Sequence, residues 1–359
     1  MGSKRKLIIV TQTFPPRVGG MQKVMASLAE GLAQREEFVA PLLVLTDHKA
    51  PQNPHYKTRH FPLPKLLRPF AKRLFLSLTA SKETLYLCDS WKSVKAIPSS
   101  HKNIVIMAHG QEYLRDTPKL YHALKRAKYI IPSSNTTKGL VLKFGVSDDK
   151  MKRIYPLYDM KKQEISSQSP SQKRSKLYFI TASRLEARKG LLPCLYAFAK
   201  LKEHLPPWHW DIIGKGPQMA LLQETSERLH LQDNVTFHGF LPNEERDALL
   251  RQGDVFLMPS YQEGNSLEGF GISYIEAAQY GVPAIAGKEG GAVEAVLDGK
   301  TGWNVDIHDE KQLCAILQEA VMDSQKRKQY GKAAQHYFEN TLISPPPLEQ
   351  VAAILHAIE

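Results

Sequence analysis

Cysteine is scarce in this chain, and long apolar stretches are missing from it altogether. The three cysteines, Cys88, Cys194 and Cys314, are odd in number and far apart, which argues against a disulfide framework or a zinc site. No run of about 18 uncharged apolar residues occurs, so no transmembrane helix is expected. The start also lacks the apolar stretch of a secretory signal. We therefore expect ordinary thiols in a reducing, cytoplasmic location.

Acidic residues are scarce in the first half of the chain. Residues 1–176 hold 32 Lys and Arg against 12 Asp and Glu, whereas residues 177–359 hold 16 against 24. This asymmetry suggests that one part of the molecule meets an anionic surface and the other does not. A merely soluble surface is the alternative. Nucleic acid is not the expected partner, because no recognition helix, aromatic RNA-binding motif or zinc module is found.

Short apolar strands alternate with helical stretches along the whole sequence. This alternation is typical of parallel, doubly wound sheets, and the length favours two domains. The expected strands are 6–11, 41–46, 84–88, 103–108 and 129–132 in the first half, and 177–182, 208–213, 235–238, 255–258 and 284–286 in the second.

A polar, serine-rich segment at 161–176 separates the two series of strands and is the predicted linker. We expect a Rossmann-like domain at 1–160 and a second one at 177–342. A C-terminal helix at 343–359 can return to the N-terminal domain. Two such domains facing one another would leave a deep interdomain cleft at the carboxyl ends of both sheets.

Two carboxylates, Glu268 and Glu276, lie eight residues apart and flank Gly269 and Gly271, where a helix is expected to begin. A strand–glycine loop–helix junction offers backbone N–H groups to an anion. Carboxylates beside it can hold hydroxyl groups while the amides hold phosphate. Phosphate next to sugar hydroxyls describes a nucleotide-sugar site.

Residues 268–276 read Glu-Gly-Phe-Gly-Ile-Ser-Tyr-Ile-Glu, and Gly-Gly-Ala-Val-Glu-Ala-Val follows at 290–296. This pattern resembles the donor-site signature of family 4 retaining glycosyltransferases (glycosyl transferases group 1), in its mannosyltransferase-like branch. Further matches lie at 183–185, 189–190, 214–217, 235–239 and 259–260, and looser ones at 14–20 and 109–110. The resemblance implies an α/β GT-B fold with two Rossmann-like domains, the first binding the acceptor and the second the nucleotide-sugar donor.

The resemblance also implies roles for individual residues. The residues implied in catalysis are His109, Glu268, Arg184 and Lys189. Those implied in donor binding are Gly19, Gly20, Arg184, Lys189, Gly214, Gly239, Phe270, Gly271, Ile272 and Glu276. Structural alternatives stay open: a turn for the glycines, a solvated pair for the two cations, a helix-capping acid for Glu268 and a structural role for His109.

No Asp-x-Asp pair occurs anywhere in the sequence. An Asp-x-Asp pair holds the metal ion that neutralises the negative charge of a nucleotide-diphosphate leaving group in metal-dependent transferases. Without such a pair, basic side chains and helix amides must neutralise this charge. We therefore expect no metal and no other cofactor, with the nucleotide sugar as a substrate.

A basic amphipathic stretch occupies residues 65–76 in the basic half. Its apolar residues could face lipid, while four cations, Lys65, Arg68, Lys72 and Arg73, meet anionic head groups. An ordinary surface helix with a core face is the alternative.

Together these features predict a retaining, metal-independent transferase. It would move a hexose, from GDP-mannose in preference to a UDP-hexose, to a glycan or lipid-linked acceptor, as in lipopolysaccharide or glycolipid biosynthesis. It would be peripheral on the cytoplasmic face of a membrane. The alternatives are a nucleotide-sugar epimerase or sugar-phosphate synthase of the same fold, and a non-catalytic sugar-nucleotide-binding membrane protein.

Overall fold

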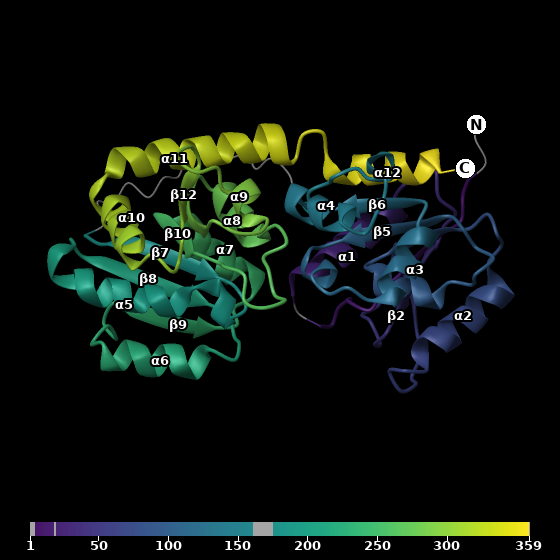
Figure 1. Ribbon diagram of the computed structural model, residues 1–359, viewed down its shortest axis with the longest axis horizontal. Coiled ribbons are helices and arrows are strands. Elements are labelled where there is room, and N and C mark those ends of the chain that lie inside the picture. The colour runs from purple at the N-terminus through teal and green to yellow at the C-terminus, as the bar shows by residue number, and fades with distance from the viewer. Residues whose placement is uncertain (1–3, 18, 161–174, 359) are drawn as a thin grey trace. The chain divides into compact units, whose positions relative to one another are not determined.

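The computed structural model describes residues 4–17, 19–160 and 175–358 and contains two compact α/β units (Figure 1). The first unit comprises the described residues of Met1–Met160 and Ile343–Glu359, and the second those of Lys161–Leu342. The predicted linker at 161–176 lies almost entirely outside the described residues. Each unit holds a six-stranded, fully parallel sheet flanked by helices, which confirms the predicted α/β fold class.

The sheet of the first unit has the strand order β3-β2-β1-β4-β5-β6. Its central strands are continuous apolar runs, because helices cover the sheet and leave no solvent-facing side. The strands are β1 (Leu7–Val10), β2 (Leu42–Thr46), β3 (Tyr56–His60), β4 (Leu85–Cys88), β5 (Ile104–Ala108) and β6 (Tyr129–Pro132). The helices are α1 (Gly20–Ala33), α2 (Arg68–Thr79), α3 (Pro118–Arg126), α4 (Asn135–Leu142) and α12 (Pro347–Ala357), with 3₁₀ turns η1 (Trp91–Ala96), η2 (Gln111–Tyr113) and η3 (Asp148–Lys150).

The sheet of the second unit has the order β12-β11-β10-β7-β8-β9. Its core is aromatic, with Phe198 stacked on Trp208 at a centroid distance of 4.1 Å. The strands are β7 (Leu177–Ala182), β8 (Trp208–Ile213), β9 (Val235–Gly239), β10 (Val255–Met258), β11 (Ala284–Gly287) and β12 (Gly302–Val305). The helices are α5 (Leu191–Leu201), α6 (Met219–Arg228), α7 (Asn243–Gln252), α8 (Ile272–Ala278), α9 (Ala292–Ala295), α10 (Glu310–Met322) and α11 (Ser324–Tyr337), with turns η4 (Ala187–Lys189) and η5 (Lys202–His204) and the π-helical turn η6 (Phe338–Leu342).

The chain returns to the first unit at its C-terminal end. Helix α12 packs against α1, and Arg35 pairs with Glu349 at 2.5 Å. Within the described residues, none of the helices combines the length and apolarity needed to cross a membrane. The three cysteines are free thiols, and Cys88 and Cys194 are buried.

Helix α2 differs from the sequence-based interpretation at one of its four cations. Lys72 is only 2% exposed, and its ammonium group donates to Asp47 Oδ1 at 2.6 Å and to the Thr11 carbonyl at 3.1 Å. The prediction that Lys72 contacts a membrane is therefore wrong. The buried lysine instead ties α2 to the segments that follow β1 and β2, because a charge removed from water needs close partners.

Replacing Lys72 tests this anchoring role. Lys72→Met leaves the Asp47 carboxylate and the Thr11 carbonyl without their shared donor, so we expect the free energy of unfolding to fall by about 2–3 kcal/mol. Urea unfolding followed by circular dichroism measures the change. Lys65→Met, which removes an exposed cation of the same segment, is the matched control and is expected to change stability by no more than about 0.5 kcal/mol. Equal losses in the two variants would contradict the anchoring role.

Candidate functional site

The residues of the donor-site motif gather at the carboxyl edge of the second sheet. Strands β7 and β10 are neighbours there, and the chain leaves them toward β8 on one side and β11 on the other. Such a switch in strand order opens a crevice between the two outgoing loops, which is where doubly wound sheets bind ligands. The loop after β7 carries η4, and the loop after β10 carries Glu268.

Glu268 is the centre of a cluster of charges at this switch point. Its Oε2 atom lies 2.5 Å from Lys189 Nζ and 3.2 Å from Arg188 Nη1. The side chains of all three residues are at most 14% exposed. The two predicted residues Lys189 and Glu268, which are 79 positions apart in sequence, are thus brought into direct contact.

The cluster keeps Glu268 in its charged form. Burial alone would raise the pKa of this carboxyl group, but the charges of Lys189 and Arg188 more than offset that effect, and the net pKa is lower than usual. A depressed carboxyl pKa means that the negative charge is present at neutral pH and is lost only as the pH falls through the lowered value.

Arg188 was missed by the sequence reasoning, which singled out Arg184 from the same loop. The Arg184 side chain is 72% exposed and pairs with Glu186 at 3.2 Å. Arg188 is the arginine that contacts Glu268, and it also donates to Glu186 at 3.0 Å. The sequence offered one signal, which is that Arg188 stands next to Lys189. Lys189 directly precedes Gly190, the left-handed residue that follows η4.

Glu276 is the fifth residue of α8 and is buried. One of its carboxylate oxygens lies 3.3 Å from the guanidinium group of Arg246 in α7. Burial lowers the pKa of Arg246, but Glu276 and Asp247 raise it by more than burial lowers it, so this arginine stays charged. No feature of the sequence pointed to Arg246, because its carboxylate partner Glu276 lies 30 positions further along the chain.

Two glycines of the site are required by close packing of neighbouring loops. A Cβ atom on Gly214 would lie 1.8 Å from the Ser183 carbonyl oxygen, and one on Gly290 would lie 2.5 Å from the Glu268 carbonyl oxygen. The loops that leave β7, β8, β10 and β11 therefore touch backbone to backbone. The absence of a side chain at Gly214 is explained by this contact alone, whatever else the residue binds.

The other predicted donor-binding residues lie along the same edge. Gly239 ends β9, and its carbonyl accepts from the Gly214 N–H at 2.7 Å. Gly271 has φ +90° at the start of α8, and Ile272 is the first residue of that helix. The Phe270 side chain is buried, so its ring belongs to the core of the unit.

Three predicted residues, Gly19, Gly20 and His109, belong to the first unit and follow β1 and β5. A Cβ atom on Gly20 would meet nothing within 4 Å, so the backbone at the start of α1 is open to approach. The His109 backbone N–H donates to Glu112 at 2.8 Å. Its Nε2 atom is buried without a hydrogen-bond partner among the described residues, which leaves it able to take one from a ligand.

A second buried carboxylate, Asp89, organises the loop that leads to Gly19. Asp89 follows β4, is fully buried, and accepts hydrogen bonds through Oδ2 from the backbone N–H groups of Gln12 and Thr13 and from the hydroxyls of Thr11 and Thr13, at 2.8–3.0 Å. Its Oδ1 accepts from the Ser93 hydroxyl at 2.5 Å. Strands β1 and β4 are neighbours at the switch point of the first sheet, so Asp89 fixes the loop there.

The arrangement in the second unit can bind a polar anion and its attached hydroxyl groups. Lys189, Arg188 and the exposed Arg184 supply positive charge from the loop after β7. Glu268, in the loop after β10, and Glu276, in α8, supply hydrogen-bond acceptors.

Comparisons with known proteins agree with this chemistry. The model of the family described as glycosyl transferases group 1 matches residues 162–337. The GDP-mannose-dependent alpha-(1-6)-phosphatidylinositol monomannoside mannosyltransferase of Mycolicibacterium smegmatis is 28% identical, with 92% of this chain and 93% of the relative aligned.

Among solved structures, Anabaena HepE in complex with UDP-glucose is similar with a TM-score of 0.76 at 21% identity, covering 98% of this chain and 99% of that one. A sucrose-phosphate synthase from Thermosynechococcus elongatus has a TM-score of 0.78 at 19% identity, covering 99% and 100%. These structures confirm the predicted GT-B fold. The motif at Glu268–Glu276, the family match over the second unit and the whole-length relative together show that the chain is a glycosyltransferase of the glycosyl transferases group 1 family.

Proposed function

We propose that this protein is a retaining, metal-independent hexosyltransferase that transfers mannose from GDP-mannose to a lipid-linked or glycan acceptor at a membrane surface. The observation that carries the proposal is the contact of Lys189 and Arg188 with Glu268 at the switch point of the second sheet. This contact places cations that can bind a diphosphate next to a carboxylate that can bind sugar hydroxyls. A nucleotide sugar presents both groups.

The choice of GDP-mannose rests on the relatives by sequence. The mycobacterial enzyme aligned over the whole chain is described as GDP-mannose-dependent, and so is a similar enzyme of Corynebacterium glutamicum, at 26% identity. The UDP-glucose complex of HepE is only 21% identical, so it supports the fold and carries no weight on the donor.

In the proposed reaction the bond between the sugar C1 and the diphosphate oxygen breaks, and its electron pair stays on the diphosphate. The acceptor hydroxyl oxygen bonds to C1 from the same face, and its proton passes to the leaving phosphate oxygen. Lys189 and Arg184, with Arg188 beside them, stabilise the charge that develops on the diphosphate. Because basic side chains neutralise the diphosphate, no Asp-x-Asp pair is needed to hold a metal ion, and the sequence contains none.

The remaining residues take supporting roles in this proposal. Glu276 binds the ribose hydroxyls, with Arg246 holding its carboxylate, and Glu268 binds the transferred sugar. His109, in the first unit, keeps its predicted catalytic role, and Gly19 and Gly20 keep their predicted role in donor binding. The buried and unpartnered Nε2 atom of His109 suits a hydrogen bond to the sugar.

Association with the membrane is assigned to α2 and the residues before it. Four apolar side chains, each four residues after the last, are strongly exposed: Leu66 at 83%, Phe70 at 65%, Leu74 at 63% and Leu78 at 77%. Lys65 and Arg73 flank this stripe and are exposed as well. Arg68 contributes less than predicted, because its guanidinium group donates to the Leu63 carbonyl and lies 3.8 Å from Asp47. An apolar stripe edged by cations is typical of helices that lie in a membrane interface.

A transfer assay tests the proposed reaction. Labelled GDP-mannose, UDP-glucose and UDP-N-acetylglucosamine are supplied separately with a membrane lipid extract, with and without EDTA. We expect label to pass from GDP-mannose to lipid in both conditions, and the product to be α-linked by NMR. Loss of transfer with EDTA contradicts metal independence, transfer from a UDP-sugar alone contradicts the donor, and a β-linked product contradicts retention. Release of an epimerised sugar without acceptor would make the protein an epimerase.

The role of the charge cluster predicts a change in pH dependence. Arg188→Gln removes one of the two cations that lower the pKa of Glu268, so the acid limb of the kcat/KM profile should move to higher pH. Arg184→Gln is the control: it removes a cation of the same loop that does not contact Glu268, so activity should fall while the acid limb stays in place. An unmoved limb in Arg188→Gln would rule out this role for the cluster.

The membrane role of α2 predicts a loss of vesicle binding. The double variant Phe70→Ser/Leu74→Ser should bind vesicles of 70% phosphatidylcholine and 30% phosphatidylglycerol about tenfold more weakly, because it removes two apolar side chains from the interface. Val39→Ser/Leu142→Ser, at two other exposed apolar positions of the first unit, should bind as the unchanged protein does. Sedimentation with the vesicles measures both, and equal binding by all three proteins would refute the membrane role.

A further inference from the structure

A basic groove lies beside the exposed face of α2, and neither the donor site nor the apolar stripe accounts for it. Helices α2 and α3 both pack against η1, and a hollow of about 240 Å³ lies where the three elements meet. Its polar lining is entirely basic, and no acidic side chain lines it. The lining residues are Arg73, Val94, Lys95, Pro118, Lys119, His122, Ala123 and Arg126.

The two arginines are held firmly at the wall of this groove. Arg126 donates to the carbonyls of Val94 at 3.2 Å, Ile97 at 3.2 Å and Pro98 at 2.7 Å. Arg73 donates to the Lys95 carbonyl at 3.1 Å. Both guanidinium groups are thus fixed on the backbone of η1 and the residues after it, with no salt bridge to either in the described part of the chain.

The lysines are placed where elementary electrostatics disfavours them. Lys119 lies in the first turn of α3, at the positive end of the helix dipole. Burial lowers the pKa of Lys95, and the neighbouring charges of Lys119 and Lys92 lower it further. Burial and the charge of Arg73 likewise lower the pKa of Arg126. Repulsion of this kind is relieved when an anion binds.

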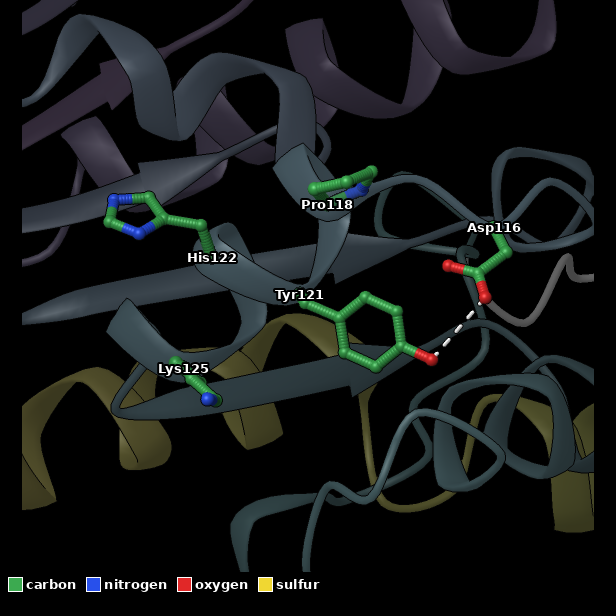
Figure 2. Close-up of a pocket in the computed structure, with 5 residues that line it drawn as sticks. All are labelled: Asp116, Pro118, Tyr121, His122 and Lys125. Carbon is green, nitrogen blue, oxygen red and sulfur yellow. Dashed lines mark hydrogen bonds between the residues drawn. The ribbon is translucent and has the colours of Figure 1, made fainter.

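A second, more open hollow of about 690 Å³ continues from the groove along α3, and Pro118 and His122 line both. Figure 2 shows its lining, with the Tyr121 hydroxyl turned toward Asp116, 3.4 Å away, and Lys125 on the same helix. The groove therefore opens to solvent on the α3 side, while Arg73, next to the exposed Leu74, borders it on the α2 side.

We propose that the groove between α2, η1 and α3 binds the terminal phosphate of an anionic lipid head group while the apolar stripe of α2 lies in the same membrane. This inference rests on the membrane association proposed above. Arg73 both flanks the apolar stripe and lines the groove, so it links the groove to the stripe. Four basic side chains and a histidine suit a phosphomonoester or diphosphate better than the single negative charge of a phosphodiester.

Vesicles with two kinds of phosphate test the proposal. One set contains phosphatidic acid, whose terminal phosphomonoester is accessible, and the other contains phosphatidylglycerol at an amount that gives the same zeta potential. We expect the full-length protein to bind the phosphatidic acid vesicles about tenfold more tightly. Lys95→Gln/Lys119→Gln should lose this preference and bind both sets about equally.

Two further variants separate the groove from general electrostatics and from the apolar stripe. Lys143→Gln/Lys152→Gln removes the same charge from exposed positions of the first unit outside the groove, and should weaken binding to both sets while keeping the preference. Phe70→Ser/Leu74→Ser should do the same. The preference thus measures the groove, and the absolute affinity measures membrane docking.

Soluble dihexanoyl phosphatidic acid, titrated by calorimetry below its micellar concentration, tests the groove without a membrane. We expect it to bind to the unchanged protein and at least tenfold more weakly to Lys95→Gln/Lys119→Gln. If inorganic pyrophosphate bound more tightly than this lipid, and Lys95→Gln/Lys119→Gln abolished that binding, the ligand of the groove would be a free phosphate compound and the assignment to lipid would be overturned. A preference for phosphatidic acid that survives in the groove variant would overturn the site itself.

Discussion

Burying a carboxylate is costly unless cations or hydrogen-bond donors surround it, and both units meet this cost at the switch point of their sheet. Asp89 is satisfied by the loop after β1, and Glu268 by the loop after β7. In each case the acid follows one of the two strands at the switch point and its partners follow the other. Each carboxylate therefore fixes, in its own unit, the loop that bears the candidate residues. If either loop moved, the carboxylate would remain buried without its partners, at the full cost of its desolvation.

The same constraint explains how α2 can leave an apolar stripe in solvent. A surface helix is normally held by its apolar face, but α2 buries only Lys72 and Leu76. The Lys72 ammonium group, with its partners Asp47 and Thr11, attaches this helix together with Leu76 and the partly buried Phe75, which pack on the core. Because these contacts hold the helix on another face, its apolar stripe is not used for folding and is available for another surface.

Much of the fold could be predicted from sequence, because the central strands are short apolar runs that alternate with helical stretches. The two strands that were missed, β3 (Tyr56–His60) and β12 (Gly302–Val305), lie at sheet edges. One is polar and alternates in burial, and the other begins inside a glycine-rich run. The motif located Glu268 and Lys189, but Arg188, Arg246 and the burial of Lys72 could not be predicted. Periodicity assigns a residue to a face of an element, whereas its charge partner comes from a segment distant in sequence.

Net charge is for this reason an incomplete guide to what the basic half of the chain binds. Lys72 donates to a carboxylate and to a backbone carbonyl inside the unit, and Arg68 donates to a backbone carbonyl with Asp47 nearby. The groove beside α2 brings four cations together, and its lining contains no acidic side chain. An apolar stripe gives affinity for any bilayer, since hydrophobic burial is not directional. Selection of one membrane lipid over another then has to come from fixed donors such as Arg73 and Arg126, whose geometry the backbone of η1 sets before any lipid arrives.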